Sequence, residues 1–319
     1  MAELLVLCAI TEEMRKRLED AFAFVELNRL EDRDGWLSAH GAEVRFILTD
    51  GALGVPAEIF AKLPNAQIIS SYGVGYDGVD VASATARGVP VCHTPGVLNA
   101  EVATTALMLY LACWRDLEAG MAHAKGGAWE RDGAPPLSRT ADGRTIGILG
   151  LGRIGKAVAA KLAPFEPRIL YYGRSRQDVP YTYYDDLIAM AHACDTLINV
   201  APGGDGTRHL INRDVIEAIG PEGYLINVGR GSTVDEAALI EAVESGALGG
   251  AGLDVFANEP HIPAALRACK RAILLPHVGS ATVETRRAMG NLAIDNLIAF
   301  KEGRPLLSPV PESLALLSV

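Results

Sequence analysis

The sequence predicts an α/β fold built from two doubly wound domains. Three observations support this class. Short apolar runs alternate with helical patterns along most of the chain, a glycine-rich turn joins one such run to a helix, and 319 residues are too many for one small core. We expect residues 1–99 with 287–319 to form one domain and residues 100–286 to form the other.

The first domain is expected to be the smaller one, with a flavodoxin-like arrangement of strands and helices. A helix start is indicated at Thr11, which precedes two acidic residues. A glycine-rich loop, Ser71–Gly78, directly follows one strand. Apolar runs predict four strands: Leu4–Ala9, Phe46–Leu48, Gln67–Ser70 and Val89–Cys92.

The second domain is expected to be Rossmann-type, with a mostly parallel sheet. It opens with a helix over Glu101–Trp114 that is apolar nearly all round and therefore buried, at a domain crossing or a subunit interface. Residues 126–144 are expected to form a loop. Later strands are predicted at Arg168–Tyr172, Thr196–Val200, Tyr224–Val228, Ala251–Asp254 and Ala272–Leu275, and helices at Asp185–His192, Arg213–Ile219 and Asp235–Ser245. A long helix over Val283–Phe300 is expected to return to the first domain, before a tail that its prolines keep extended.

Composition and charge argue against several classes of protein. The net charge is −10 and no long basic run offsets it, so no nucleic-acid or membrane-surface partner is expected. No apolar stretch reaches about 18 residues and no basic region precedes the first apolar run, so neither a transmembrane helix nor a signal peptide is predicted. The 5 cysteines are scattered without a C-x-x-C pair. They indicate free thiols in a reducing compartment, and we predict a cytoplasmic location.

The segment Thr145–Lys156 is the most informative stretch of the chain. Its apolar run Ile146–Leu149 predicts a buried strand, and apolar residues at helical spacing follow the turn. Between strand and helix, Gly150, Gly152 and Gly155 form the pattern G-x-G-x-x-G. In this context the pattern indicates a dinucleotide site, with the pyrophosphate at the helix N-terminus. The alternative is a plain glycine turn in an α/β domain.

The residues after the next strand indicate which dinucleotide the site binds. An NAD site usually carries an acidic residue here, about 20 residues past the glycine turn. This chain has Gly173, Arg174, Ser175 and Arg176 instead. Two guanidinium groups and a hydroxyl would bind a 2′-phosphate, which a carboxylate would repel. We therefore predict NADP (NADPH) as the cofactor, the alternative being an exposed basic turn.

Three side chains at strand ends of the second domain could carry chemistry, because ligands of open α/β sheets lie beyond the carboxyl ends of the strands. Arg230 stands between two glycines, where a planar cation could hold a carboxylate or a polarised carbonyl. His277 could pass a proton to or from a substrate oxygen. Glu259 could accept the other ring N–H and fix the tautomer. Together they supply what hydride transfer to a carbonyl needs: an electrophile, a proton donor and a group that orients the donor.

Each of the three also has a structural alternative. His277 could be a satisfied structural histidine, Glu259 could cap the turn before Pro260, and Arg230 could belong to a surface ion pair. Their joint placement beside a dinucleotide site favours the catalytic interpretation. No metal site is expected. The residues expected to bind the cofactor follow the strands of this domain: Gly150, Leu151, Gly152, Arg153, Ile154, Gly155, Gly173, Arg174, Ser175, Arg176, Ala201, Pro202, Thr207, Val228, Gly229, Arg230, Asp254, His277 and Gly279.

Over nearly its whole length the sequence resembles the D-isomer-specific 2-hydroxyacid dehydrogenases. The motifs that carry the resemblance are Gly150–Gly155, Asn227–Gly231, Gly252–Phe256 with Glu259–Pro260, and Pro276–Ser280. The resemblance implies that Arg230 binds the substrate carboxylate and carbonyl, that His277 is the general acid/base and that Glu259 pairs with it. It also implies that the Val74 and Gly75 backbone binds the substrate carboxylate, in a cleft between the domains.

The basic run Gly173–Arg176 departs from the acidic form that is commoner in this family. It resembles the NADP-using reductases for glyoxylate, hydroxypyruvate and hydroxyphenylpyruvate, and Tyr181–Tyr184 and Pro276–Glu284 are similar to that branch as well. Formate dehydrogenases of the family carry Gln at the position of Glu259, which argues against formate. Phosphoglycerate members usually keep the acidic cofactor residue that is missing here. The resemblance thus implies NADPH-dependent reduction of a small 2-oxo acid to the D-2-hydroxy acid, with aryl pyruvates as the alternative substrates.

Two other functions stay open at this point. One is a dinucleotide-sensing binding protein, because some relatives of the family act as transcriptional corepressors. The other is an NAD-dependent dehydrogenase that works in the oxidative direction. The resemblance further implies a homodimer formed through residues 101–125.

Overall fold

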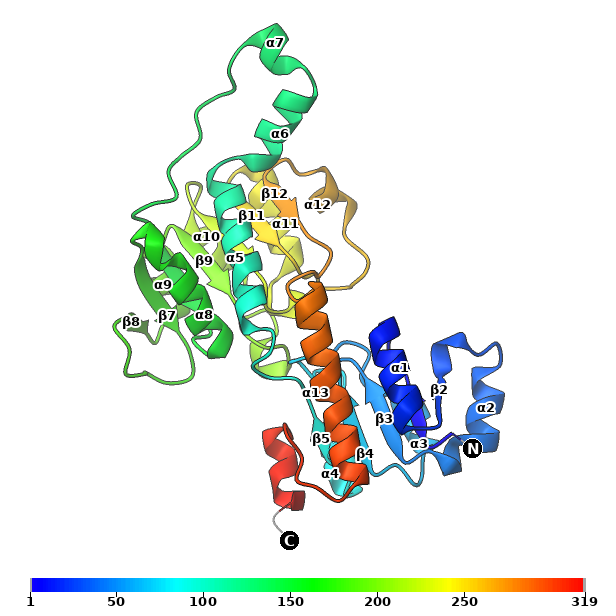
Figure 1. The fold of residues 1–319 in the computed structure, drawn as a ribbon. Helices are drawn as coiled ribbons and strands as arrows, with labels where there is room; N and C mark the ends of the chain where they lie inside the picture. The colour runs from blue at the N-terminus through cyan, green and yellow to red at the C-terminus, as the bar shows by residue number, and fades with distance from the viewer. Residues whose placement is uncertain (1, 318–319) are drawn as a thin grey trace. The chain divides into compact units, whose positions relative to one another are not determined.

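The structure is a computed structural model that describes residues 2–317, and these form two compact units (Figure 1). Unit 1 runs to Leu98 and resumes at Thr282, and unit 2 covers Asn99–Ala281. The sequence placed these divisions at residues 100 and 287. In the structure the second division lies at Thr282. This residue is the N-cap of the last long helix, and its side chain accepts a hydrogen bond from Thr285 N. The chain therefore changes unit before the helix begins.

Unit 1 contains a five-stranded parallel sheet with the order β2-β1-β3-β4-β5. This is the strand order of flavodoxin-like sheets, so the expected fold class is confirmed. All four expected strands are present. The strands are β1 (Leu4–Val6), β2 (Phe24–Glu26), β3 (Phe46–Thr49), β4 (Ile68–Ser71) and β5 (Val91–Cys92). The helices are α1 (Glu12–Ala21), α2 (Arg33–His40), α3 (Ala57–Ala61), α4 (Val81–Ala86) and α13 (Val283–Lys301).

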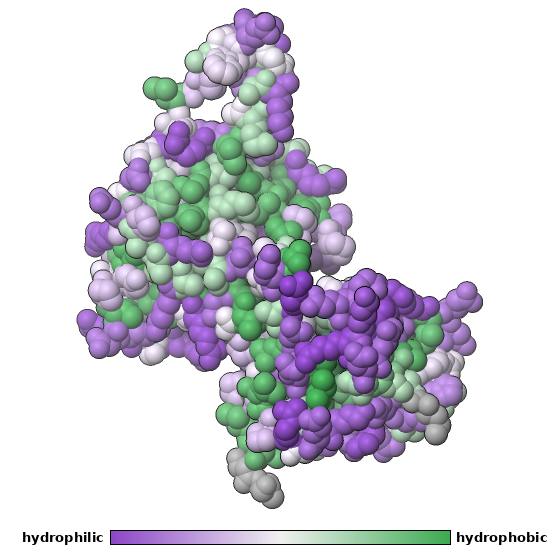
Figure 2. Space-filling model, viewed as in Figure 1, coloured by the Kyte–Doolittle hydropathy of each residue, from purple (hydrophilic) through white to green (hydrophobic). Residues whose placement is uncertain are grey.

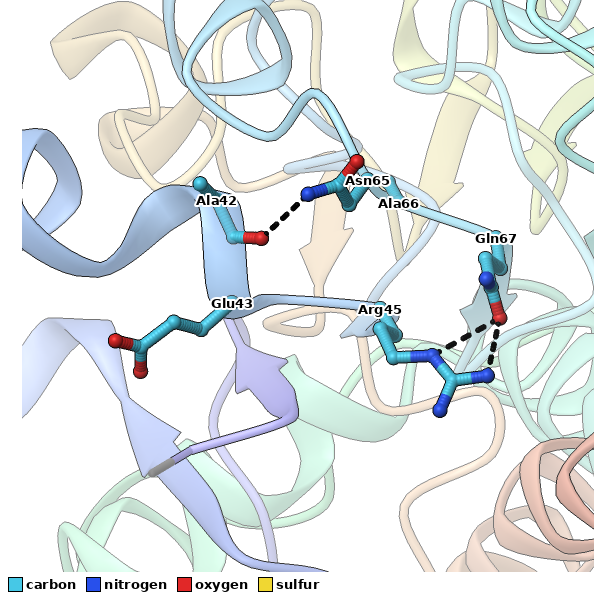
Figure 3. A pocket seen from close by; sticks show the side chains of 6 residues that line it. All are labelled: Ala42, Glu43, Arg45, Asn65, Ala66 and Gln67. Atoms are coloured by element: carbon cyan, nitrogen blue, oxygen red, sulfur yellow. Dashed lines mark hydrogen bonds between the residues drawn. The ribbon is translucent and has the colours of Figure 1, made fainter.

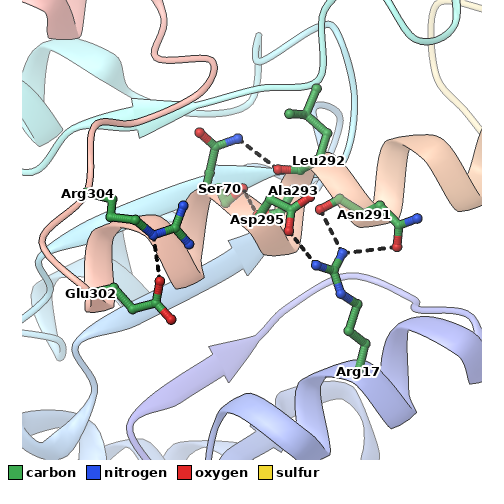
Figure 4. Close-up of polar contacts among 9 residues, drawn as sticks. Arg17, Ser70, Asn291, Leu292, Ala293, Asp295, Glu302 and Arg304 are labelled. Atoms are coloured by element: carbon green, nitrogen blue, oxygen red, sulfur yellow. Dashed lines mark hydrogen bonds and ion pairs between the residues drawn. The ribbon is translucent and has the colours of Figure 1, made fainter.

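Helix α13 packs on the sheet of unit 1, which explains why the last long helix belongs with the first part of the chain. Buried Ser70 on β4 donates its hydroxyl to Ala293 O at 2.8 Å (Figure 4). Arg17 on α1 donates to the Asn291 side chain at 3.0 Å and pairs with Asp295. Polar contacts from β4 and α1 thus hold α13 in unit 1.

Unit 2 contains a seven-stranded parallel sheet with the order β12-β11-β10-β9-β6-β7-β8. Counted from β6, its first six strands follow the order 3-2-1-4-5-6 of Rossmann folds, which confirms the expectation. The strands are β6 (Thr145–Leu149), β7 (Arg168–Tyr172), β8 (Thr182–Tyr184), β9 (Thr196–Asn199), β10 (Tyr224–Asn227), β11 (Gly250–Leu253) and β12 (Ala272–Leu274). The helices are α5 (Asn99–Trp114), α6 (Leu117–Lys125), α7 (Ala128–Asp132), α8 (Arg153–Leu162), α9 (Leu187–His192), α10 (Arg213–Ile219), α11 (Glu236–Ser245) and α12 (Ala264–Ala268).

The expected burial of α5 is confirmed, and its cause is close packing on the sheet of unit 2. Trp114 is buried and donates its indole N–H to Thr196 Oγ1 at 3.0 Å. Gly252 on β11 gives α5 room, because a Cβ there would lie 3.0 Å from Leu109 Cβ. Within residues 2–317, no helix is long and apolar enough to cross a membrane.

Several local expectations were wrong. The region 126–144 contains helix α7, which has no buried residue and therefore no apolar periodicity to reveal it. The tail carries a short 3₁₀ helix, Pro311–Leu317, because proline is well tolerated at a helix start. Strands β2 and β8 were missed, since neither is a buried apolar run: two of the three residues of β2 are only half-buried, and β8 has no buried residue.

Candidate active site

The predicted site residues of unit 2 follow the carboxyl ends of six parallel strands. Since these strands run in one direction, their ends meet at one edge of the sheet. The residues lie after β6 (Gly150–Gly155), β7 (Gly173–Arg176), β9 (Ala201–Thr207), β10 (Val228–Arg230), β11 (Asp254, Glu259) and β12 (His277, Gly279).

The structure shows why each of the three positions in the turn after β6 is occupied by glycine. Gly150 has φ of +96°, which L side chains rarely adopt. A Cβ at Gly155 would overlap the carbonyl oxygen of Gly150, so only glycine lets α8 start this close to β6. Gly152 is the N-cap of α8 and lacks a side chain to cap the helix. The N–H groups of the first turn therefore face outward, which fits the pyrophosphate of a dinucleotide.

The basic run after β7 is exposed and unpaired. Arg174, Ser175 and Arg176 are all exposed, and within residues 2–317 neither guanidinium group has a hydrogen-bond or ion-pair partner. Positive charge held without an internal partner fits an external phosphate. The sequence analysis did not single out Gln177, which follows this run and donates its side-chain amide to Leu151 O at 2.9 Å.

The structure brings His277 and Glu259 together. The His277 ring Nδ1 lies 2.6 Å from Glu259 Oε2, and Glu259 Oε1 accepts from Phe256 N at 3.0 Å. Burial raises the pKa of Glu259, but the hydrogen bonds from His277 and Phe256, with the charges of His277 and Arg230, bring it below its usual value. Glu259 is therefore an ionised acceptor, and the proton on the near side of the ring belongs to Nδ1.

Asp254 holds the turn that carries His277. Its carboxylate accepts from Val278 N at 2.7 Å and Gly279 N at 2.8 Å, and its carbonyl accepts from His277 N at 2.8 Å. His277 itself has φ of +53°, an uncommon conformation for a residue with a Cβ. Burial raises the pKa of Asp254, against the lowering effect of these two backbone donors. Asp254, which the sequence analysis expected to bind the cofactor, therefore also stabilises the turn that carries His277.

A buried polar network fixes the backbone at Arg230. Asn227 Nδ2 donates to Arg230 O at 3.1 Å, and Thr233 Oγ1 donates to the same oxygen at 2.6 Å. Asn199 Nδ2 donates to Asn227 Oδ1 at 2.9 Å and to Thr233 Oγ1 at 2.6 Å. Asn199 Oδ1 also accepts from Ala201 N at 3.0 Å. The network therefore links the loops after β9 and β10. The sequence showed Asn227 within a motif but gave it no role.

Thr207 has a local role in the loop after β9. Its hydroxyl donates to Pro202 O at 2.8 Å, which closes the loop on itself. The residue was expected to contact the cofactor, and that role remains a prediction.

Val74 and Gly75 belong to unit 1, in the glycine-rich loop after β4. Their carbonyl groups are engaged: Val74 O lies 2.8 Å from His93 Nδ1, and Gly75 O accepts from Ser71 Oγ at 3.3 Å. Their N–H groups have no acceptor within residues 2–317. A pair of free adjacent N–H groups is suited to a carboxylate. His93 was not expected to take part, and its ring braces this loop.

A hollow elsewhere in unit 1 is not a candidate. It has a volume of about 430 Å³ and lies at the amino ends of β3 and β4, away from the carboxyl edge (Figure 3). Its guanidinium group, Arg45, is already bonded to Gln67 Oε1 at 2.8 Å and 3.1 Å. The lining residues are Ala42, Glu43, Arg45, Asn65, Ala66 and Gln67.

Comparison with known proteins gives a consistent result. The sequence profile described as "D-isomer specific 2-hydroxyacid dehydrogenase, NAD binding domain" matches residues 107–279. A glyoxylate/hydroxypyruvate reductase A of Arabidopsis thaliana is 39% identical over 307 residues, which cover 96% of this chain and 98% of the relative. A hydroxyphenylpyruvate reductase of Plectranthus scutellarioides is 40% identical over 307 residues, with the same coverage of 96% and 98%.

A solved structure is similar over the whole fold. It is an NADPH-dependent glyoxylate/hydroxypyruvate reductase from Sinorhizobium meliloti in complex with NADP and malonate. The TM-score is 0.90 at 43% sequence identity, and the match covers 97% of each chain.

Proposed function

The chain belongs to the D-isomer specific 2-hydroxyacid dehydrogenase family, and on that premise we propose that it reduces a small 2-oxo acid to the D-2-hydroxy acid with NADPH. The substrate is of the glyoxylate or hydroxypyruvate type. The observation that carries the proposal is the Glu259–His277 pair, 2.6 Å apart, at the sheet edge that also holds Arg230 and the glycine turn. NADPH, when bound, supplies the hydride.

His277 supplies the proton in this proposal. Its Nδ1–H stays bonded to Glu259, so Nε2 is the nitrogen that donates to the substrate carbonyl oxygen. The negative charge of Glu259 stabilises the imidazolium before transfer and keeps the ring oriented. After transfer the ring is neutral, with its remaining proton on Nδ1, and a proton from solvent restores it.

Arg230 and the Val74–Gly75 backbone are proposed to bind the substrate carboxylate. The guanidinium of Arg230 is suited to planar, bidentate contacts with a carboxylate or a carbonyl oxygen. Its backbone is held by two hydrogen bonds to one carbonyl oxygen, which limits the freedom that substrate binding must remove. The free N–H groups of Val74 and Gly75 support the second contact.

NADPH is favoured over NADH by the residues after β7. Arg174 and Arg176 are exposed and free of internal partners, and no acidic residue stands at the usual ribose position. The Sinorhizobium meliloti relative, described as NADPH-dependent, supports the same preference.

A homodimer formed through residues 101–125 is part of the proposal. Helices α6 and α7 have no buried residue and stand away from the sheet of unit 2 (Figure 1). The visible face of unit 2 over α5 is largely apolar (Figure 2). Within residues 101–125 the exposed apolar side chains are Met108, Leu117 and Met121, and Trp129 and Leu137 follow shortly after. Several large apolar side chains exposed on one stretch of the chain support a subunit contact. The cytoplasmic location is likewise kept as a prediction.

A substrate panel with NADPH and NADH tests the proposal. We expect NADPH oxidation with glyoxylate or hydroxypyruvate, and His277→Ala should lower kcat by roughly 10²–10⁴ while NADPH binding is retained. His192→Ala, an exposed histidine at the end of α9, is the matched control and should leave kcat unchanged. Turnover that survives in His277→Ala refutes the proton donor.

Aryl pyruvates are the second candidate substrates, because a hydroxyphenylpyruvate reductase is 40% identical to this chain. A kcat/KM higher for hydroxyphenylpyruvate than for glyoxylate and hydroxypyruvate would favour them. Tight NADPH binding without oxidation by any 2-oxo acid would instead indicate a dinucleotide sensor.

A further inference from the structure

Tyrosine hydroxyls hold both ends of the segment Gly173–Gln177, the first half of the loop between β7 and β8. Tyr171, a fully buried residue of β7, accepts at its hydroxyl from Gln177 N at 2.7 Å and donates to Gln177 O at 3.3 Å. Tyr183 of β8 donates its hydroxyl to Gly173 O at 3.3 Å. The rings of the two tyrosines also pack together, with centroids 5.3 Å apart, within the range of aromatic pairs. The segment from Gly173 to Gln177 is therefore anchored, although its middle is exposed.

Gln177 connects this loop to the glycine turn. Its side-chain amide donates to Leu151 O at 2.9 Å, and Leu151 lies between Gly150 and Gly152. Besides the strand pairing nearby, where Gly150 N donates to Tyr172 O at 2.9 Å, this is a direct side-chain link between the two loops. One loop fits the pyrophosphate and the other carries the exposed guanidinium groups.

We propose that Gln177, held by Tyr171, is a positioning residue that sets the preference for a 2′-phosphorylated nucleotide. This inference rests on the proposed use of NADPH. Arg174 and Arg176 have no internal partner, so only the course of the loop places their charges relative to the glycine turn. Releasing the link leaves the same charges on a looser loop, and binding must then order them. The glycine turn keeps its own bond from Gly150 N to Tyr172 O, so loss of the link should affect the rest of the nucleotide less than the 2′-phosphate.

Gln177→Met tests the proposal, because it keeps the length of the side chain and removes the amide donor. The probes are adenosine 2′,5′-bisphosphate and 5′-AMP, which differ in the 2′-phosphate, with binding measured by calorimetry. We expect the Kd of the bisphosphate to rise roughly two- to tenfold, the effect of one lost hydrogen bond, and the Kd of 5′-AMP to change less than about twofold. The ratio of kcat/KM for NADPH over NADH should fall by the same factor.

Two further variants separate positioning from general stability. Tyr171→Phe removes the hydroxyl that holds Gln177, so it should also raise the Kd of the bisphosphate. In the double variant with Gln177→Met, the rise in binding free energy should be smaller than the sum of the two single effects. Gln67→Met removes a hydrogen-bonded surface glutamine of unit 1 and should change neither Kd. If melting shows that Gln177→Met is unfolded, Gln177→Ala replaces it in the same comparison.

The outcomes distinguish this inference from the proposed function. Equal weakening of both nucleotides, or no weakening of either, overturns the positioning role of Gln177. A wild-type protein that does not prefer the bisphosphate over 5′-AMP overturns it as well. Selective loss of bisphosphate binding supports the role even if no 2-oxo acid is reduced, a result that would overturn only the proposed reaction.

Discussion

Glu259→Gln tests the proton-transfer geometry most directly, because it replaces the charged partner of His277 by a neutral group of the same shape. The carboxylate accepts two hydrogen bonds, from His277 Nδ1 at 2.6 Å and from Phe256 N at 3.0 Å. An amide has one acceptor atom, so if Phe256 N keeps the oxygen, the NH₂ group faces Nδ1 and opposes the imidazolium. A hydrogen bond to a charged group contributes about 1.5–3 kcal/mol, which corresponds to roughly 10- to 150-fold in kcat/KM.

The assay is kcat/KM for the preferred 2-oxo acid, measured with NADPH across the pH range in which the protein stays folded. At neutral pH, kcat/KM of Glu259→Gln should be lower than that of the wild type by the factor given above, because the amide cannot support the imidazolium as the carboxylate does. On the acid side, the wild-type ion pair is lost only as pH falls through the lowered pKa of Glu259, below the ordinary value of about 4.3. That acid limb should be absent from the variant.

Glu236→Gln is the matched control, because Glu236 accepts from Ala257 N at 3.1 Å in the same region of the sheet edge. It should leave the pH profile unchanged. The same profile in wild type and Glu259→Gln, or an equal effect in Glu236→Gln, would refute the ion-pair reasoning.

Three other predictions follow from the same structure. Arg174→Ala combined with Arg176→Ala should raise the KM for NADPH at least about tenfold and that for NADH less than twofold; equal losses would exclude a phosphate clamp. Thr233→Val should lower the free energy of unfolding by about 1–3 kcal/mol, because it leaves buried polar atoms near Arg230 unsatisfied, and should raise the KM for the 2-oxo acid; unchanged denaturation curves would contradict it. Thiol titration at neutral pH should detect one fast-reacting thiol, Cys269, in the folded protein and all 5 thiols only after unfolding. Two fast-reacting thiols in the folded protein would contradict the burial of the other four. Burial raises the pKa of the others to about 12: Cys8, Cys92, Cys113 and Cys194.

The sequence alone was sufficient for features that depend on neighbouring residues. The strand–turn–helix around Gly150–Gly155 is a local pattern, and the structure gives each glycine the geometry that the pattern requires. Alternating apolar runs and helices predicted two parallel sheets, because parallel strands need a crossover and the crossover is nearly always right-handed. Placing Arg230, Glu259 and His277 after strands also placed them at one edge.

Only the tertiary structure decided which groups touch. The sequence predicted that Glu259 pairs with His277, but not the 2.6 Å geometry of the contact, which depends on the turn that Asp254 braces. The same holds for the bond from Gln177 to Leu151. Such contacts depend on the pairing of distant strands and the course of the loops between them, which arise from the packing of the whole unit. Local preference sets which element a residue joins, whereas packing sets the distance between two side chains on different elements.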